Sequence, residues 1–155
     1  MSGLRIMEGG LDDSRVIALA EHHAATARSA TPSGNGHSFS ASRLRAADIR
    51  FFSAWDDDEV VGIGAFKALC PDHGEVKSMH TADAARRRGI GLAILERIEV
   101  AARCDGLRRL SLETHPGAHF LAAVALYRRC GFVECGPFGD HFADPSSIFM
   151  TKELN

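Results

Sequence analysis

The residues best suited to chemistry form a cationic, glycine-rich stretch, Arg86-Arg87-Arg88-Gly89-Ile90-Gly91. Strand-like residues precede this stretch and helix-like spacing follows it, so we predict that a helix opens at Arg86. Glycines let a ligand approach the backbone closely, and the first N–H groups of a helix have no intrahelical partners. Cations at this end oppose the helix dipole unless an anion is present. We therefore interpret residues 86–92 as a phosphate-binding site.

Two segments of the chain resemble the GNAT superfamily of N-acyltransferases, which bind acetyl-CoA by its pyrophosphate. Arg86-x-x-Gly89-x-Gly91 matches the R/Q-x-x-G-x-G/A signature of that superfamily. Residues 125–132, Ala-Leu-Tyr-Arg-Arg-Cys-Gly-Phe, look like its A-x-Y-x-x-x-G-F segment. Both motifs occur in the superfamily's order, with a strand between them, and the resemblance extends from about Arg50 to the end of the chain.

The resemblance implies an α/β GNAT fold, with a mixed, mostly antiparallel central sheet whose splayed strands admit the pantetheine arm and are flanked by helices. It also implies an N-acetyltransferase that moves an acetyl group from acetyl-CoA, a co-substrate, to a primary amine by direct transfer in a ternary complex. The acceptor would be a small molecule or a peptide. The tail of the chain is similar to a group of small bacterial acetyltransferases whose substrates are uncertain.

The resemblance assigns roles in the active site to particular residues of this chain. Tyr127, the only tyrosine of the chain, would be the general acid toward the CoA sulfur. A backbone N–H near Met79 would stabilise the oxyanion. The set expected to bind acetyl-CoA comprises Met79, His80, Thr81, Arg86, Arg87, Arg88, Gly89, Ile90, Gly91 and Leu92.

The resemblance points to Glu75 as the base that deprotonates the acceptor ammonium. Glu75 stands eleven positions before Arg86, where the histone-acetylating branch of the superfamily places its catalytic glutamate. Glu113, His80, His115 and an ordered water remain alternatives. The acidic residues Glu75, Glu113, Asp140 and Asp144 are expected to make the acceptor side negative and to favour a cationic amine.

The chain departs from the superfamily at two positions. Asp83 stands where proline is frequent, and Phe120 replaces an asparagine that contacts CoA in many members. One cofactor contact is therefore in doubt, whereas the pyrophosphate loop is untouched. Two other functions remain open, namely a CoA- or nucleotide-binding sensory module without catalysis and a Rossmann-like nucleotide site. The third glycine of the Rossmann fingerprint would fall at Ile94, which counts against that alternative.

The expected elements place these residues in a sheet flanked by helices. Asp12 or Asp13 caps a helix whose buried stripe contains Val16, Ile17, Ala20, Ala24 and Ala27. Strands follow at residues 49–55, 60–69 and 75–81, and residues 31–42 are expected to form a long loop, of the kind that often binds ligands. The resemblance implies that this loop borders the acceptor site, with Phe39 as its apolar anchor. A helix over 86–104 buries Ile90, Ile94, Ile98 and Ala101 and exposes Glu96, Arg97, Glu99 and Arg103. A strand at 107–113, a helix at 118–130 and strands at 132–135 and 147–152 complete the chain.

Composition limits the function classes. The chain has 155 residues, 45% of them hydrophobic, and a formal net charge of −2. We expect one domain over 1–155 with no nucleic-acid or membrane partner, and homodimer formation stays open. The absence of a signal-peptide core at the N-terminus favours a cytoplasmic location. The four cysteines are expected to be reduced core thiols, and no metal site is expected, because ligand spacing typical of zinc is lacking.

Overall fold

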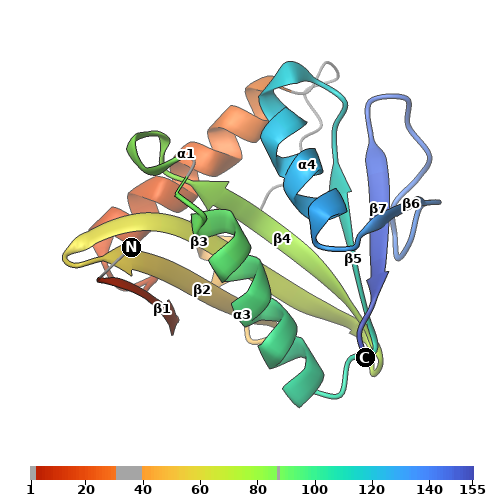
Figure 1. Cartoon of the computed structure of the whole chain (residues 1–155), viewed down its shortest axis with the longest axis horizontal. Helices are drawn as coiled ribbons and strands as arrows, with labels where there is room; N and C mark the ends of the chain where they lie inside the picture. The colour runs from red at the N-terminus through yellow and green to blue at the C-terminus, as the bar shows by residue number, and fades with distance from the viewer. Residues whose placement is uncertain (1–2, 31–39, 87) are drawn as a thin grey trace.

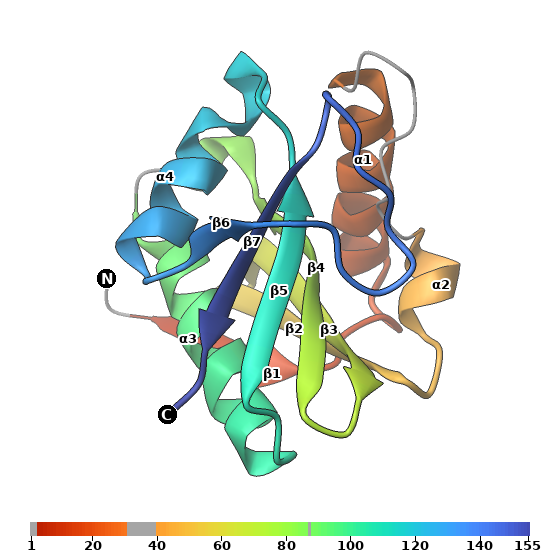
Figure 2. The ribbon, with the colours of Figure 1, turned by 90° about the vertical axis from the view of Figure 1, so that its right-hand side faces the viewer.

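A computed structural model describes residues 3–30, 40–86 and 88–155 as a sheet with helices on both faces (Figures 1 and 2). The strands are β1 (Leu4–Glu8), β2 (Ile49–Asp56), β3 (Glu59–Cys70), β4 (His73–Thr81), β5 (Arg109–Thr114), β6 (Val133–Cys135) and β7 (Ile148–Glu153). The α-helices are α1 (Ser14–Ala30), α2 (Ala41–Leu44), α3 (Ile90–Cys104) and α4 (Leu121–Arg129). Short 3₁₀ helices, η1 (Asp83–Ala85) and η2 (Ala118–Phe120), precede α3 and α4.

The seven strands form one sheet in the order β1-β2-β3-β4-β5-β7-β6. All neighbouring strands are antiparallel except β4 and β5, which are parallel. The β4–β5 pairing contains only three residue pairs, from His73↔Arg109 to Glu75↔Ser111. Beyond these pairs β4 and β5 diverge like the arms of a V, and α4 lies where the two strands are apart (Figure 1). The predicted mixed, mostly antiparallel sheet with splayed strands is therefore confirmed.

The two faces of the sheet bury separate hydrophobic cores because strand side chains alternate between faces. The face covered by α3 and α4 packs Ile90, Ile94 and Ile98 against Phe66, Leu110 and Leu112. The face covered by α1 and α2 packs Val16, Ala20 and Leu44 against Phe51, Trp55 and Ile63. Figure 2 shows α1 and α2 on one side of the sheet and α3 and α4 on the other. Leu110 and Leu112 point to the α3 face, as their alternation predicts.

Helix α1 begins as the sequence predicts. Asp13 caps it, because Asp13 Oδ1 accepts a hydrogen bond from the backbone N–H of Arg15 at 2.9 Å. The stripe of Val16, Ala20, Ala24 and Ala27 is buried, and Ile17 is half-buried at its edge.

The prediction that α3 begins at Arg86 is wrong by four residues. Gly89 adopts a left-handed conformation (φ 76°) at the N-cap, and α3 begins at Ile90. Arg86 and Arg88 therefore lie in the connection before the helix rather than in its first turn. Glycine tolerates this conformation far better than residues with a Cβ, and so allows the chain to turn from η1 into α3.

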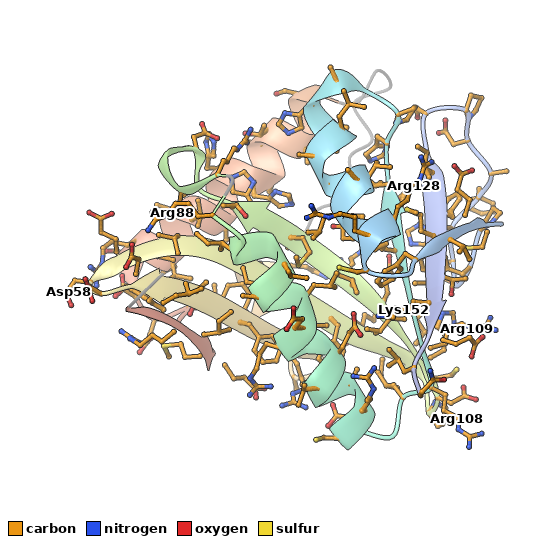
Figure 3. The ribbon with its side chains drawn as sticks, in the orientation of Figure 1. Asp58, Arg88, Arg108, Arg109, Arg128 and Lys152 are labelled. Carbon is orange, nitrogen blue, oxygen red and sulfur yellow. The ribbon has the colours of Figure 1, made fainter. Side chains whose placement is uncertain are left out.

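Two predictions about side-chain burial are also wrong. Glu99 is buried rather than exposed, because Lys152 and Arg103 approach its carboxylate at 2.9 and 3.5 Å. Figure 3 shows Lys152 on β7, the strand from which this lysine reaches Glu99 of α3. The four cysteines are free, as expected, but none is a core residue: Cys70 and Cys104 are exposed, and Cys130 and Cys135 are half-buried. Among the described helices, none combines the length and apolar character needed to span a bilayer.

Candidate active site at the opening between β4 and β5

The opening between β4 and β5 leads into a cavity of about 90 Å³. Residues from α1, β4, β5, η2 and α4 line this cavity, so it passes from one face of the sheet to the other. The lining includes Glu75, Glu113 and Tyr127, which the sequence predicts to be functional, and also Ser78. The divergence of two strands thus brings residues far apart in the sequence to one space.

A β-bulge lies in β4 beside the cavity. The register between β3 and β4 shifts between Ile63↔His80 and Ala65↔Lys77, so that Ser78 and Met79 oppose the single residue Gly64. A bulge leaves its extra residue outside the hydrogen-bond ladder and redirects side chains. Ser78 has a positive φ of 57°, which is uncommon for a residue with a Cβ. Ser78 lines the cavity, and its buried hydroxyl oxygen has no hydrogen-bond partner among the described residues.

Tyr127 reaches the cavity from α4. Its side chain is only 6% exposed, and its ring packs at its edge against Phe132. Burial raises the pKa of the Tyr127 phenol, with a smaller contribution from Cys130. The phenol is therefore protonated at neutral pH and can act as a proton donor but not as a base.

The cavity's α1 side holds a buried cluster of charged groups. Oε2 of Glu75 lies 2.8 Å from Nε2 of His141 and 3.3 Å from Nζ of Lys77. The other imidazole nitrogen of His141, Nδ1, lies 3.6 Å from Oε1 of Glu113. Ser147 donates a hydrogen bond of 2.6 Å to Oε2 of Glu113. His141 thus lies between the two carboxylates and Lys77 approaches Glu75, so both buried carboxylates have polar partners, as their burial requires.

The long connection between β6 and β7 brings His141 to this cluster. Figure 2 shows that the connection crosses to the face of the sheet that carries α1 and α2. The ring of Phe138 contacts the rings of His73, His141 and Phe149, which anchors the connection on the sheet. Asp144 accepts hydrogen bonds from the backbone and hydroxyl of Ser146, and Asp140 is exposed. Only Glu75 and Glu113 of the four acidic residues expected on the acceptor side line the cavity.

Two histidines form a second polar group beside the cavity. Nδ1 of His23 on α1 lies 3.0 Å from Nδ1 of His80 on β4. Burial, together with smaller contributions from neighbouring histidines, lowers the pKa of His23 to about 3 and that of His80 to about 4. Both rings are therefore neutral at pH 7, and one donates its proton to the other. The second nitrogen of His80, Nε2, is buried, and no residue of the described chain forms a hydrogen bond with it.

The start of α3 offers backbone N–H donors. Gly89 provides no side-chain cap, and among the described residues no side chain accepts a hydrogen bond from the N–H groups of the first turn. A Cβ at Gly91 would stand 3.0 Å from Cδ2 of Leu126 on α4 and 3.8 Å from Oγ1 of Thr81. Gly91 therefore faces the narrow space between the end of β4 and α4, in line with the opening of the sheet.

The arginines before α3 make ion pairs within the chain. Arg86 pairs with Asp83 at 2.9 Å, and Arg88 pairs with Asp56 at 2.5 Å. Figure 3 shows Arg88 extending from the connection before α3 toward the β2–β3 hairpin. Arg87 and Phe39 lie outside the described residues, as does most of the loop predicted at 31–42; Ala41–Leu44 at its end forms α2. The sequence did not reveal that acidic partners hold two of the arginines.

The structure brings Tyr127, Glu75 and Met79 together at one cavity and sets the glycines of α3 at the end of β4. His80 and Thr81 lie at the end of β4 beside this space. Sequence reasoning missed Lys77, Ser78 and the position of His141. The length of the 136–145 connection was a signal for His141, whereas a bulge at Ser78 leaves no side-chain pattern in the sequence.

The site fits acetyl-CoA by three features of the structure: the opening of the sheet, the uncapped N-terminus of α3, and the unpartnered polar atoms of Ser78 and His80. Among the described residues, no group of His, Cys, Asp and Glu has the geometry to hold a metal ion. A splayed mixed sheet with this site defines the GNAT class of acyltransferases.

Comparisons with known proteins agree with this class. The model of the acetyltransferase (GNAT) family matches residues 16–132, so the chain belongs to the GNAT family of acetyltransferases. It is 40% identical over 144 residues to the uncharacterized N-acetyltransferase YsnE of Bacillus subtilis, covering 93% of this chain and 95% of that protein. It is 43% identical over 124 residues to an IAA acetyltransferase of Azospirillum brasilense, covering 79% and 80%.

Solved structures share the whole fold. A Klebsiella pneumoniae protein described as an acyl-CoA N-acyltransferase superposes with a TM-score of 0.81 at 27% identity, covering 98% of each chain. The GNAT domain of a Streptomyces lividans protein has a TM-score of 0.75 at 20% identity and covers 97% of this chain, a likeness that concerns the fold alone.

Proposed function

We propose that the protein transfers an acetyl group from acetyl-CoA to the primary amine of a small molecule or peptide, directly, in a ternary complex. The observation that carries the proposal is the cavity at the opening of the sheet, because it holds carboxylates on one face and the buried phenol of Tyr127 on the other. An acyl transfer to an amine needs a proton acceptor on the side of the amine and a proton donor on the side of the sulfur.

Binding of acetyl-CoA would use the backbone rather than the arginines alone. The first-turn N–H groups of α3 near Gly89 and Gly91 would receive the pyrophosphate, assisted by the helix dipole. The backbone between Met79 and Thr81 would hold the pantetheine arm where β4 has left β5. Arg86 and Arg88 would contribute positive charge, although each already has an acidic partner.

Glu75 is the proposed base, acting on the acceptor ammonium directly or through water. Its Oε2 is held by His141 and Lys77, whereas no hydrogen bond from a described residue reaches its Oε1. This second oxygen is the one free to accept a proton. Glu113 lies on the other side of His141, and the pair of carboxylates would attract a cationic amine into the cavity.

Tyr127 is the proposed acid. Acetyl-CoA, once bound, supplies a thioester whose sulfur leaves as a thiolate, and the buried phenol would donate a proton to it. Incubation of the protein with acetyl-CoA and a panel of primary amines should release free thiol. Tyr127→Phe should lower kcat by roughly 10²–10⁴-fold while the affinity for acetyl-CoA stays within about twofold.

The variant also tests the assignment. Tyr127→Phe removes one hydroxyl from a buried ring whose packing against Phe132 it retains. A variant with full turnover at saturating acceptor, under conditions where chemistry limits the rate, would show that Tyr127 is structural. Failure of the wild-type protein to release thiol with any amine, despite binding acetyl-CoA, would favour a CoA-binding sensory module.

A further inference from the structure

Ser78 combines two unfavourable features that the fold does not explain. Its backbone has a φ of 57°, a conformation that is unfavourable for a residue with a Cβ and that glycine adopts readily. Its side chain is 8% exposed, and the hydroxyl oxygen is buried without a hydrogen-bond partner. An unsatisfied buried hydroxyl is itself destabilising.

Glycine at this position would remove both costs. Glycine elsewhere in the chain occupies positions of positive φ, such as Gly89 and Gly131, so the left-handed conformation at Ser78 is an exception. Among the described non-glycine residues, only Asp57 shares the feature, and Asp57 lies in the tight turn between β2 and β3. Ser78 lies instead in a strand, at a bulge that borders the cavity.

The position of the bulge indicates which ligand atom the hydroxyl would meet. Along β4, Ser78 lies three residues beyond Glu75, the proposed base, and Tyr127, the proposed acid, lines the same cavity from α4. The acyl carbon must lie between the attacking nitrogen, next to the base, and the sulfur, next to the acid. Ser78 lines the same cavity as Glu75 and Tyr127, and its buried hydroxyl has no partner among the described residues, so the acyl oxygen is a partner that this hydroxyl lacks in the free protein.

We propose that the Ser78 hydroxyl binds the acyl oxygen of the thioester and donates a hydrogen bond to the negative charge that develops on this oxygen. This inference rests on the proposed function. The amine nitrogen forms a bond to the acyl carbon while the C=O π electrons move to the oxygen, which Ser78 stabilises. The electrons then return, the C–S bond breaks, and the thiolate takes a proton from Tyr127. Glu75 has already accepted the proton of the ammonium, so the second nitrogen proton passes to water, which in turn reprotonates Tyr127.

Two variants distinguish the effect of the Ser78 hydroxyl from the effect of its strained backbone. Ser78→Ala removes the hydroxyl and keeps the strained backbone, whereas Ser78→Gly removes both. We expect each to lower kcat by roughly 10–10²-fold, because loss of a donor to a developing oxyanion has effects up to about 10²–10³-fold. Ser78→Gly should not lower the melting temperature. Asp57→Gly is the matched control: it changes the other non-glycine residue with positive φ, distant from the cavity, and should keep wild-type kcat.

A binding measurement tests the assignment without any acceptor. CoA lacks the acyl oxygen, so the ratio of the Kd of CoA to the Kd of acetyl-CoA reports contacts to the acyl group. This ratio should fall by roughly two- to tenfold in both Ser78 variants, the value of one hydrogen bond. It should stay unchanged in Asp57→Gly.

The outcomes are distinct. A folded Ser78→Gly protein with the wild-type Kd ratio and wild-type kcat would overturn the role of the hydroxyl and leave the proposed function intact. A wild-type protein that binds neither CoA nor acetyl-CoA would overturn the proposed function itself. Because the Kd ratio requires no amine, the Ser78 assignment is decided even when the panel contains no substrate.

Discussion

Gly91 offers the sharpest test of the pyrophosphate site, because folding and binding respond to its replacement in opposite directions. Gly91 is the second residue of α3, and a Cβ there would stand 3.0 Å from the end of the Leu126 side chain. This flexible carbon must move by a few tenths of an ångström. Replacing glycine within a helix gains roughly 0.5–1 kcal/mol, and a carboxylate in the first turn gains about 0.3–1 kcal/mol. Gly91→Glu should therefore fold at least as stably as the wild type.

Binding should suffer strongly. A glutamate carboxylate about 5 Å from one phosphate charge, at an effective dielectric constant of about 20, is repelled by roughly 3 kcal/mol. This repulsion alone weakens the affinity for acetyl-CoA by more than about 100-fold. We expect calorimetry to detect no binding of acetyl-CoA or CoA, while thermal denaturation shows an unchanged or higher midpoint.

Two further variants divide the effect between charge and size. Gly91→Gln has nearly the volume of glutamate without the charge, and Gly91→Ala adds only the Cβ that meets Leu126. We expect an affinity order of wild type, Ala, Gln and Glu, with the largest step between Gln and Glu. Wild-type affinity in Gly91→Glu would refute the assignment of the pyrophosphate to α3. Equal losses in Gln and Glu would show that space, not charge, excludes the ligand.

Two other predictions concern titration. Glu75→Gln should lower kcat and remove the acidic limb of the pH–rate profile of acetyl transfer. Glu113→Gln should keep that limb and raise the KM for a cationic amine. If Glu75→Gln retains the acidic limb, the base is Glu113, a histidine or water. The pKa values of His23 and His80 in the folded protein, about 3 and about 4, lie below the value of about 6.5 in the unfolded chain. The unfolded state therefore binds more protons between these values, so stability is complete above pH 6.5 and is lost as the pH falls toward 4 and 3. His23→Gln should make the melting temperature less dependent on pH between 6.5 and 4, and an identical dependence would contradict the lowered pKa of His23.

Local sequence patterns determined most of the helices and strands and the two motifs that border the site. The pair Asp12 and Asp13 indicated the start of α1, although only the structure chose Asp13 as the cap. The alternation of Leu110 and Leu112 indicated the buried face of β5, because caps and strand periodicity act over a few residues. The motifs at residues 86–91 and 125–132 likewise indicated the family, because each places its glycines or its tyrosine within a single helix end and can be recognised over a few residues. The predicted start of α3 at Arg86 was wrong, because the left-handed turn at Gly89 that sets the actual start depends on how β4 must connect to α3.

Only the tertiary structure determined how these parts meet. Arg86 and Arg88 have acidic partners because η1 and the β2–β3 hairpin lie beside them, and Glu99 is buried because β7 brings Lys152 to it. His141 reaches Glu75 across 66 positions of sequence, through a connection whose path depends on the packing of Phe138. The bulge at Ser78 arises from the register between β3 and β4, which no side-chain pattern encodes. Interactions between residues distant in sequence depend on the assembled sheet, and the cavity that they line exists only because β4 and β5 separate.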